Sequence, residues 1–309
     1  MSAPPTGVTL TVGADRGGAR LDAFVHDALP RLSRRLVQRL IAEAEVRVNG
    51  RPAAKGARLT PGDRVTLPAL PASIVAEPEL SLPVVHEDDQ LVAVEKPGGM
   101  PGHALDPRQR GTAAAFLLAR YPEMAGVGDP LAPGLVHRLD TGTSGLLLAA
   151  RTPEAHAAVR AALRARAVEK RYLAVVEGAA QELDGRRLNL PLAHDPRDRR
   201  RMIPAVGTAR TARTVRFWPA ETAVSAARSS GQRTLLEVTI RTGVTHQVRA
   251  HLAHLGHPVA GDELYGGSPT GLAAGRHALH ASRLALPHPA TGRPLTLESS
   301  LPRELEALL

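Results

Sequence analysis

The chain has 309 residues, of which 43% are hydrophobic, and carries a formal net charge of +9 at pH 7. This length allows one large hydrophobic core and a smaller companion domain, and the basic excess favours a polyanionic partner such as nucleic acid. The absence of cysteine excludes a disulfide framework, a thiolate metal site and a cysteine nucleophile. No stretch has the length of a membrane span or the pattern of a secretory signal, so we expect a cytoplasmic protein.

The N-terminal region is predicted to begin with a disordered segment, residues 1–14, followed by two short helices. Apolar residues recur at helical spacing over 21–29 and again over 36–41. Ser33 is a favourable N-cap for the second helix, because its hydroxyl can accept a hydrogen bond from a free backbone N–H.

A small hairpin is predicted after these helices, at the two-residue turn Asn49-Gly50. A further turn at Pro61-Gly62-Asp63 closes a compact unit that spans residues 15–68. The arginines of its helical part fall mostly off the apolar face, where they either contact a polyanionic partner or form a solvated surface: Arg31, Arg34, Arg35 and Arg39.

Prolines interrupt residues 69–83, which we predict to be a semi-rigid linker. Residues 84–309 then contain short apolar runs bounded by glycine and proline, a pattern typical of buried strands. Helices are predicted to start at the N-cap residues Thr112 and Thr152, whereas residues 219–232 have the composition of a hairpin loop.

A polar loop, residues 137–145, lies between two of the apolar runs. It reads His-Arg-Leu-Asp-Thr-Gly-Thr-Ser-Gly, and Asp140 is its carboxylate. Charged side chains are costly to bury unless they are paired, and loops held by a rigid scaffold commonly carry function. Local chemistry leaves two interpretations: a functional site, or a tight turn in which Asp140 and Thr143 bond their own backbone.

Three later stretches also contain side chains that could take part in binding or catalysis. Tyr172 follows two basic residues at the start of an apolar strand, where a packing role is the alternative. The charge run 197–201 lies in a loop, where it contacts phosphates or is simply solvated. Histidines cluster over residues 246–257, but their spacing does not form a zinc pattern and no glutamate completes one, so we predict no metal site.

The polar loop continues into Leu-Leu, and the whole sequence resembles the catalytic motif of the RluA family of RNA pseudouridine synthases. The segment ending at Tyr172 and the stretch 242–251, Thr-Gly-Val-Thr-His-Gln-Val-Arg-Ala-His, are similar to two further motifs of that family. The resemblance implies that Asp140 is the catalytic residue. It also implies that Arg249 lies beside Asp140 and keeps it ionised, and that Tyr172 stacks on the target base.

The same resemblance implies RNA-binding roles for other arginines. Arg138 is expected to fill the gap that the target base leaves when it moves out of its stack. A basic loop that approaches RNA in the family corresponds to Arg199, Arg200 and Arg201. One departure from the family pattern is Val244, which stands where the family has an arginine.

Residues 15–68 resemble the S4 RNA-binding module, although Ala44 lies near a position where that family usually has glycine. Together the resemblances imply an α+β protein: a small S4-type α/β RNA-binding module, followed by a mixed, mainly antiparallel sheet catalytic domain of the pseudouridine synthase type at residues 84–309. The implied activity is isomerisation of specific uridines in RNA, with large-subunit ribosomal RNA the expected partner. Because this reaction involves no redox change and no energy input, we expect no cofactor. We also expect no metal and a monomeric protein.

Two other functions stay open on the sequence alone. One is an RNA-binding factor with an inactive catalytic domain. The other is a glycoside or nucleoside hydrolase, but that chemistry usually requires two carboxylates, and the sequence shows no second acid beside the polar loop.

Overall fold

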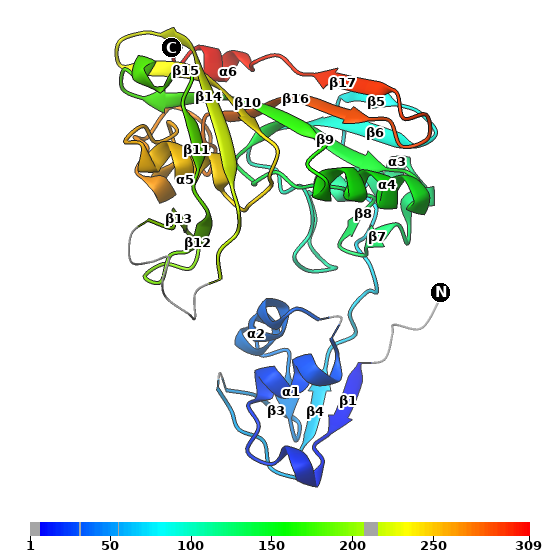
Figure 1. Ribbon diagram of the computed structural model, residues 1–309. Coiled ribbons are helices and arrows are strands. Elements are labelled where there is room, and N and C mark those ends of the chain that lie inside the picture. The colour runs from blue at the N-terminus through cyan, green and yellow to red at the C-terminus, as the bar shows by residue number, and fades with distance from the viewer. Residues whose placement is uncertain (1–6, 31, 55, 207–215) are drawn as a thin grey trace. The chain divides into compact units, whose positions relative to one another are not determined.

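The structure is a computed structural model that describes residues 7–30, 32–54, 56–206 and 216–309 (Figure 1). The chain divides into two compact units. The first unit contains residues 1–74 together with the segment 105–109, and the second contains 75–104 and 110–309.

The first unit is a four-stranded sheet with two helices. Its sheet has the order β1-β4-β2-β3, and every strand pair in it is antiparallel. The helices bury Val25, Val37 and Leu40 against Val65 of the sheet. Ser33 caps the second helix, because its Oγ accepts a hydrogen bond of 3.2 Å from the N–H of Leu36. The elements are β1 (Val8–Thr11), η1 (Ala14–Arg16), α1 (Leu21–Ala28), α2 (Arg34–Ala42), β2 (Arg47–Val48), β3 (Arg51–Pro52) and β4 (Arg64–Leu67).

The prediction of a disordered N-terminus is wrong for part of residues 1–14. Val8–Thr11 forms β1 and pairs along its whole length with β4, and Val12 is buried in the core. Four residues are too few to show a clear period, and this strand is stabilised by partners more than fifty residues away in the sequence. Residues 1–6 lie outside the described part of the chain.

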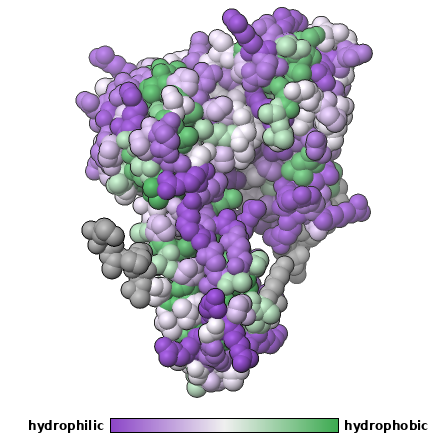
Figure 2. Space-filling model, turned by 180° about the vertical axis from the view of Figure 1, so that it is seen from behind, coloured by the Kyte–Doolittle hydropathy of each residue, from purple (hydrophilic) through white to green (hydrophobic). Residues whose placement is uncertain are grey.

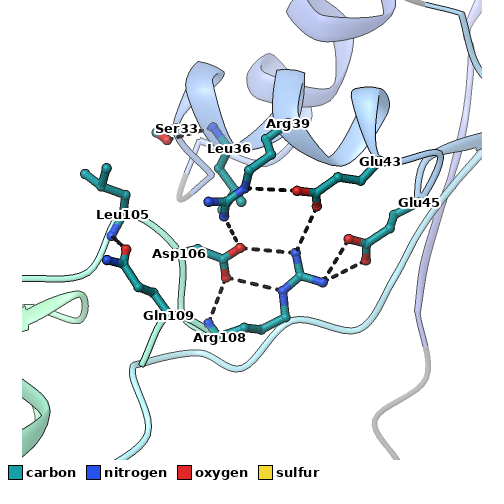
Figure 3. A network of polar contacts seen from close by, with 9 residues as sticks. All are labelled: Ser33, Leu36, Arg39, Glu43, Glu45, Leu105, Asp106, Arg108 and Gln109. Carbon is teal, nitrogen blue, oxygen red and sulfur yellow. Dashed lines mark hydrogen bonds and ion pairs between the residues drawn. The ribbon is translucent and has the colours of Figure 1, made fainter. Parts of the chain in front are cut away.

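The segment Leu105–Gln109 attaches to α2 through a network of charged side chains (Figure 3). Asp106 is almost fully buried and accepts hydrogen bonds from the guanidinium groups of Arg39 and Arg108. Arg108 also donates to Glu45 at 2.7 Å. A buried carboxylate requires such partners, because an unpaired charge away from water is strongly unfavourable.

This network changes the expectation for the arginines of the first unit. The guanidinium of Arg39 is paired with Asp106 and lies near Glu43, whereas Arg34 and Arg35 are exposed on α2. Arg31 lies outside the described residues.

The second unit is built on a mixed sheet whose described residues form nine strands (Figure 1). All pairs are antiparallel except β16 with β9, which is parallel, and the predicted α+β fold class with a mainly antiparallel sheet is confirmed. The strands in spatial order are β11 (Arg187–Asn189), β14 (Glu221–Ser229), β15 (Arg233–Ile240), β10 (Glu169–Glu177), β16 (Leu279–Pro287), β9 (Ser144–Ala150), β6 (Leu91–Lys96) and β5 (Val84–Glu87), with β17 (Pro294–Glu298) also paired to β16.

Helices and small hairpins surround this sheet. The helices are α3 (Ala113–Arg120), α4 (Pro153–Arg164), α5 (Gln247–His254) and α6 (Arg303–Glu306), with 3-10 turns η2 (Pro122–Met124), η3 (Gln181–Leu183) and η5 (Glu263–Tyr265). Two hairpins pair β7 (Gly128–Asp129) with β8 (Ala132–Pro133), and β12 (Leu192–His194) with β13 (Met202–Pro204). Thr112 and Thr152 cap α3 and α4 as predicted, each by accepting a hydrogen bond of 3.1 Å.

The strand β9 is buried on both faces of the sheet. Leu147 and Ala149 belong to the core cluster that contains side chains of α3 and α5, whereas Leu146 and Leu148 belong to the cluster that contains side chains of α4. All seven residues of the strand are buried. A strand with no solvent-facing side reads as a continuous apolar run, which is why the sequence pattern of β9 is not alternating.

Two sequence predictions need correction in this unit. Residues 219–232 are not mainly a loop, because Glu221–Ser229 forms β14, whose small and polar residues give a weak strand signal. The segment predicted as a linker, residues 69–83, is packed in its second half. Leu82 lies in the core, and Glu77 is buried and accepts a hydrogen bond of 2.7 Å from the N–H of Gly111.

The surface seen in Figure 2 is mainly hydrophilic, with hydrophobic residues in scattered groups. Among the described residues, no helix is both long enough and apolar enough to cross a bilayer.

The turn between α2 and β2 contains an alanine in a conformation that favours glycine. Ala44 has a φ of 59° and is exposed, directly after the last turn of the helix. We predict that Ala44→Gly raises the free energy of unfolding of the first unit by about 1 kcal/mol, because glycine adopts the left-handed region without the steric cost of a Cβ. Amide hydrogen exchange of buried amides such as that of Val37, in the full chain, measures this change.

The control for this prediction is Ala42→Gly, at the exposed last residue of α2. That variant should lower the free energy of unfolding by about 0.5 kcal/mol, because Ala42 is in helical conformation, which glycine disfavours. Destabilisation by both substitutions would contradict the strain that we assign to Ala44.

Candidate active site

The polar loop at residues 137–145 leads directly into the buried strand β9. Two glycines allow it to lie close to neighbouring backbone: a Cβ on Gly142 would lie 2.3 Å from the carbonyl oxygen of Gly275, and a Cβ on Gly145 would lie 2.3 Å from that of Ala281. The N–H of Leu148 donates to Nε2 of His137 at 3.0 Å, which joins the start of the loop to β9. The loop is therefore fixed from two sides.

Lys96 holds the loop from behind. Its side chain is fully buried, and Nζ donates to the carbonyl oxygens of Pro97, Met100 and Thr141 at 2.8, 2.8 and 3.2 Å. Burial, assisted by the charge of Arg276, lowers the pKa of Lys96 to about 7. Because Thr141 follows Asp140 directly, Lys96 restrains the backbone that carries the carboxylate.

Asp140 and Arg249 form an ion pair at the centre of the site, as the family resemblance implied. Nη1 of Arg249 donates to Oδ2 of Asp140 at 2.8 Å. Arg249 comes from the first turn of α5, and its side chain is only 8% exposed. The His137–Gly145 loop and the Thr242–His251 stretch, a hundred residues apart in sequence, are thus brought together by the fold.

A second carboxylate, Asp262, fixes the other side of Arg249. Nε of Arg249 donates to Oδ2 of Asp262 at 2.6 Å, and Nη2 donates to Oδ1 at 2.8 Å. The Asp262 side chain is only 1% exposed. This two-pronged pairing sets the plane of the guanidinium and leaves Nη1 directed at Asp140. The role of Asp262 was not predicted from the sequence, where it is one acid in the stretch Gly-Asp-Glu-Leu-Tyr-Gly.

The pKa of Asp140 lies below its usual range. Burial alone would raise this pKa, but the charge of His246 and the charge and hydrogen bond of Arg249 outweigh burial. Burial also lowers the pKa of His246, so this imidazole carries little charge at neutral pH. Arg249 is therefore the cation that keeps Asp140 ionised under those conditions.

The carboxylate faces a pocket of about 350 Å³. Its lining includes Tyr172 from β10 and Leu279 from β16, both largely buried. Burial raises the pKa of the Tyr172 hydroxyl, which therefore stays protonated. The volume suits a small ligand or one nucleotide base, and the mixture of an apolar wall with a few polar groups is typical of binding sites.

Arg138 is one of the residues that line this pocket. Its side chain is exposed, and Nη2 donates to Oγ1 of Thr245 at 2.8 Å. Val244, which replaces the family's arginine, lines the same pocket and packs against a small apolar cluster that includes Ala250 and Tyr265.

The predicted basic loop lies between β12 and β13. Arg199 and Arg200 are exposed, and Arg200 pairs with Asp198 at 2.7 Å. Arg201 is less exposed, and its guanidinium lies 5.5 Å from the ring centroid of Tyr265. These arginines do not line the pocket that contains Asp140.

The histidine cluster serves hydrogen bonding. His251 is fully buried and is hydrogen-bonded to Oγ1 of Thr222 at 2.8 Å and to the carbonyl oxygen of Leu190 at 3.0 Å. Nδ1 of His246 lies 3.1 Å from the hydroxyl of Tyr265. Within the described ranges, no three metal-binding side chains are grouped.

Comparison with known proteins points to one family. Residues 90–254 match the family described as RNA pseudouridylate synthase, and residues 19–65 match the S4 domain. An uncharacterized RNA pseudouridine synthase of Chloroflexus aurantiacus is 41% identical, over 94% of this chain and 89% of the relative. The ribosomal large subunit pseudouridine synthase D of Nitrosomonas europaea is 36% identical, over 98% of this chain and 87% of the relative.

The fold has counterparts among solved structures. Human RNA pseudouridylate synthase domain containing 4 aligns with a TM-score of 0.54 and 24% identity, over 72% of this chain and 90% of the human chain. At this identity the likeness supports the fold alone.

The ion pair predicts how Asp140 titrates. Arg249→Gln removes the neighbouring cation and should raise the pKa of the Asp140 carboxyl by roughly one to three units. Carbon-13 NMR of the aspartate Cγ resonances, with Asp140→Asn used for assignment, measures this pKa. Asp262→Asn is the matched control, because it removes an anion from the same cluster and cannot raise the pKa of Asp140 by charge. An unchanged Asp140 titration in Arg249→Gln would contradict the role of the pair.

Proposed function

The chain belongs to the RNA pseudouridylate synthase family, and we propose that it converts specific uridines of large-subunit ribosomal RNA to pseudouridine, with Asp140 as the catalytic residue. The observation that carries this assignment is the ionised Asp140 carboxylate, which Arg249 holds at 2.8 Å in a pocket walled by Tyr172. The pocket thus offers a base-sized space beside one fixed negative charge.

The chemistry agrees with this arrangement. Pseudouridine formation breaks the bond between N1 and C1′, turns the uracil and joins its C5 to C1′, after which C5 loses its proton. One ionised carboxylate next to the sugar serves this sequence, either as the nucleophile at C1′ or as a base on the sugar. Arg249 keeps Asp140 ionised and oriented. Tyr172 is proposed to stack on the uracil, since it is an aromatic residue in the pocket lining.

The target base must leave its stack to reach Asp140. Arg138 is proposed to occupy the vacated position, because it lines the pocket, its side chain is exposed, and a hydrogen bond to Thr245 orients it. This role requires a side chain that reaches outward from the loop, and Arg138 is two residues from the carboxylate.

RNA affinity is proposed to come from the S4-type unit and from the basic loop of the second unit. Arg34 and Arg35 are exposed on α2, and Arg199 and Arg200 are exposed between β12 and β13. Arg39 contributes less than the sequence suggested, because Asp106 already neutralises it. Arg31 remains a candidate on sequence grounds.

The RNA class is proposed from relatives. Ribosomal large subunit pseudouridine synthase D proteins of Neisseria meningitidis and Xanthomonas campestris are 33% and 34% identical to this chain. Incubation of the protein with transcripts tritiated at uracil C5 tests the assignment. We expect tritium release from large-subunit ribosomal RNA and little from small-subunit ribosomal RNA or transfer RNA. Release from transfer RNA alone would overturn the RNA class and leave the reaction intact.

The proposed mechanism predicts the effect of replacing the Asp140 carboxylate. Asp140→Asn should reduce single-turnover tritium release by roughly 10⁴-fold or more while RNA affinity changes little, because the amide can neither attack nor accept a proton. The matched control is Asp89→Asn, an exposed aspartate outside the pocket, which should keep full activity. Substantial turnover by Asp140→Asn would exclude the mechanism. Binding without turnover by the wild type would instead favour an RNA-binding factor with an inactive catalytic domain.

The proposed RNA contacts of α2 can be tested by replacing its exposed arginines. Arg34→Gln and Arg35→Gln should each flatten the dependence of log Kd on log salt concentration by about 0.7–0.9 per lost phosphate contact. Turnover at saturating RNA should change much less. Arg16→Gln is the control, because Arg16 already pairs with Asp27 at 2.8 Å. If the salt dependence of Kd in all three variants equals that of the wild type, α2 does not contact the RNA backbone.

A further inference from the structure

The pocket beside Asp140 has a second region that the proposed chemistry does not use. Its lining extends from the catalytic loop to α4 and to the segment after β15. Three arginines from these elements line this region: Arg160, Arg164 and Arg241. All three side chains are exposed, so they border open space that a ligand can enter.

Two of these arginines share one face of α4. Arg160 and Arg164 are four residues apart, so their side chains are neighbours on the helix surface. Nη1 of Arg160 donates to the carbonyl oxygen of Val136 at 3.1 Å, which directs this side chain to the start of the catalytic loop. Among the described residues, no carboxylate lies within ion-pair distance of either guanidinium. Two unpaired like charges at this spacing repel each other unless an anion lies between them.

The third arginine follows β15. Nη2 of Arg241 donates to Glu169 at 2.9 Å, which fixes the direction of the side chain. The same carboxylate also accepts a hydrogen bond from Arg171 at 3.1 Å and lies 3.9 Å from Arg283. Arg171 and Arg283 each have a second carboxylate, Glu237 and Glu298, both at 3.3 Å, whereas Arg241 has, among the described residues, only its share of Glu169.

The charge balance of the pocket is strongly positive. Asp140 is the one carboxylate among the described residues that line the pocket. Its charge is already balanced by Arg249, which also pairs with Asp262 outside the lining. The remaining wall adds no further anion, since Gly243 and Val244 are uncharged. The α4 side of the pocket therefore presents exposed positive charge, which favours an anionic ligand.

We propose that Arg160, Arg164 and Arg241 form a phosphate-binding arm of the pocket, which holds the RNA backbone next to the target uridine. This inference rests on the proposed function, because it places the target nucleotide at Asp140. Guanidinium groups bind phosphate oxygens in a two-pronged geometry, and backbone contacts of this kind fix the register of a nucleic acid without reading its sequence. The arm thus positions the sugar of the target nucleotide against the carboxylate.

The experiment measures single-turnover tritium release as a function of RNA concentration, with a large-subunit ribosomal RNA transcript tritiated at uracil C5. The variants are Arg160→Gln, Arg164→Gln, Arg241→Gln and the double variant of the two α4 residues. Each single variant should raise the half-saturating RNA concentration on the order of 10-fold, whereas the rate at saturation should fall only a few-fold. The salt dependence of binding should flatten by about 0.7–0.9 per lost contact.

Two controls separate charge from other effects. Arg166→Gln removes an exposed arginine two residues from Arg164 that pairs with Glu221 and does not line the pocket, so it should behave as wild type. Arg164→Lys keeps the positive charge and should retain most of the salt dependence while losing part of the affinity.

The outcomes are distinguishable. If the α4 double variant matches Arg166→Gln in half-saturating concentration and salt slope, the phosphate-binding arm does not exist. A lowered saturated rate with unchanged affinity would also overturn it, since the arginines would then act on the chemistry. If the wild type binds the transcript but releases no tritium, the proposed function fails. The salt slopes of the same variants then still decide whether these arginines bind phosphate.

Discussion

The site depends on how a buried carboxylate is kept charged. Asp140 lies at the wall of a pocket where burial favours its neutral form, and Arg249 provides the opposing charge at 2.8 Å. Arg249 is itself buried, and Asp262 binds its two other nitrogens. The order of the three groups, acid, base, acid, leaves one net negative charge, and the more exposed acid is the one that faces the pocket. Each member of the cluster therefore makes the burial of the next one possible.

The sheet converts this electrostatic arrangement into a fixed geometry. β9 is buried on both faces, so the loop that precedes it has little freedom to move along the strand direction. Gly145 lets β9 approach Ala281 of β16 more closely than any side chain would allow, and Lys96 ties Thr141 to the turn after β6. α5 then carries Arg249 to the loop from the same side of the sheet as α3. Positioning comes from strands and a helix, and only the carboxylate itself lies on a loop.

Local features of the fold were predictable from the sequence because short-range physics specifies them. The caps Ser33, Thr112 and Thr152 fall where their residue types predict, and the polar loop 137–145 lies directly before a buried strand as its flanking apolar runs predict. Features that depend on distant partners were missed. Four residues of β1 show no period of their own, and β14 consists largely of small and polar residues. Asp262 and Asp106 are ordinary acids in turns, and only tertiary contacts with Arg249 and Arg39 reveal their roles.

The first unit is not one continuous piece of sequence, and this has a consequence for how the protein divides into modules. Leu105–Gln109 belongs to that unit although the chain on either side of it, up to Ala104 and from Arg110, belongs to the second. A fragment that stops at residue 74 would lack Asp106 and Arg108. Arg39 would then lose its buried partner Asp106, and Glu45 would lose Arg108, which donates to both of its carboxylate oxygens. Transfer of residues 1–74 alone into another protein would therefore leave the charge network of the S4-type unit incomplete. In evolutionary terms, α2 and the 105–109 loop are expected to change together.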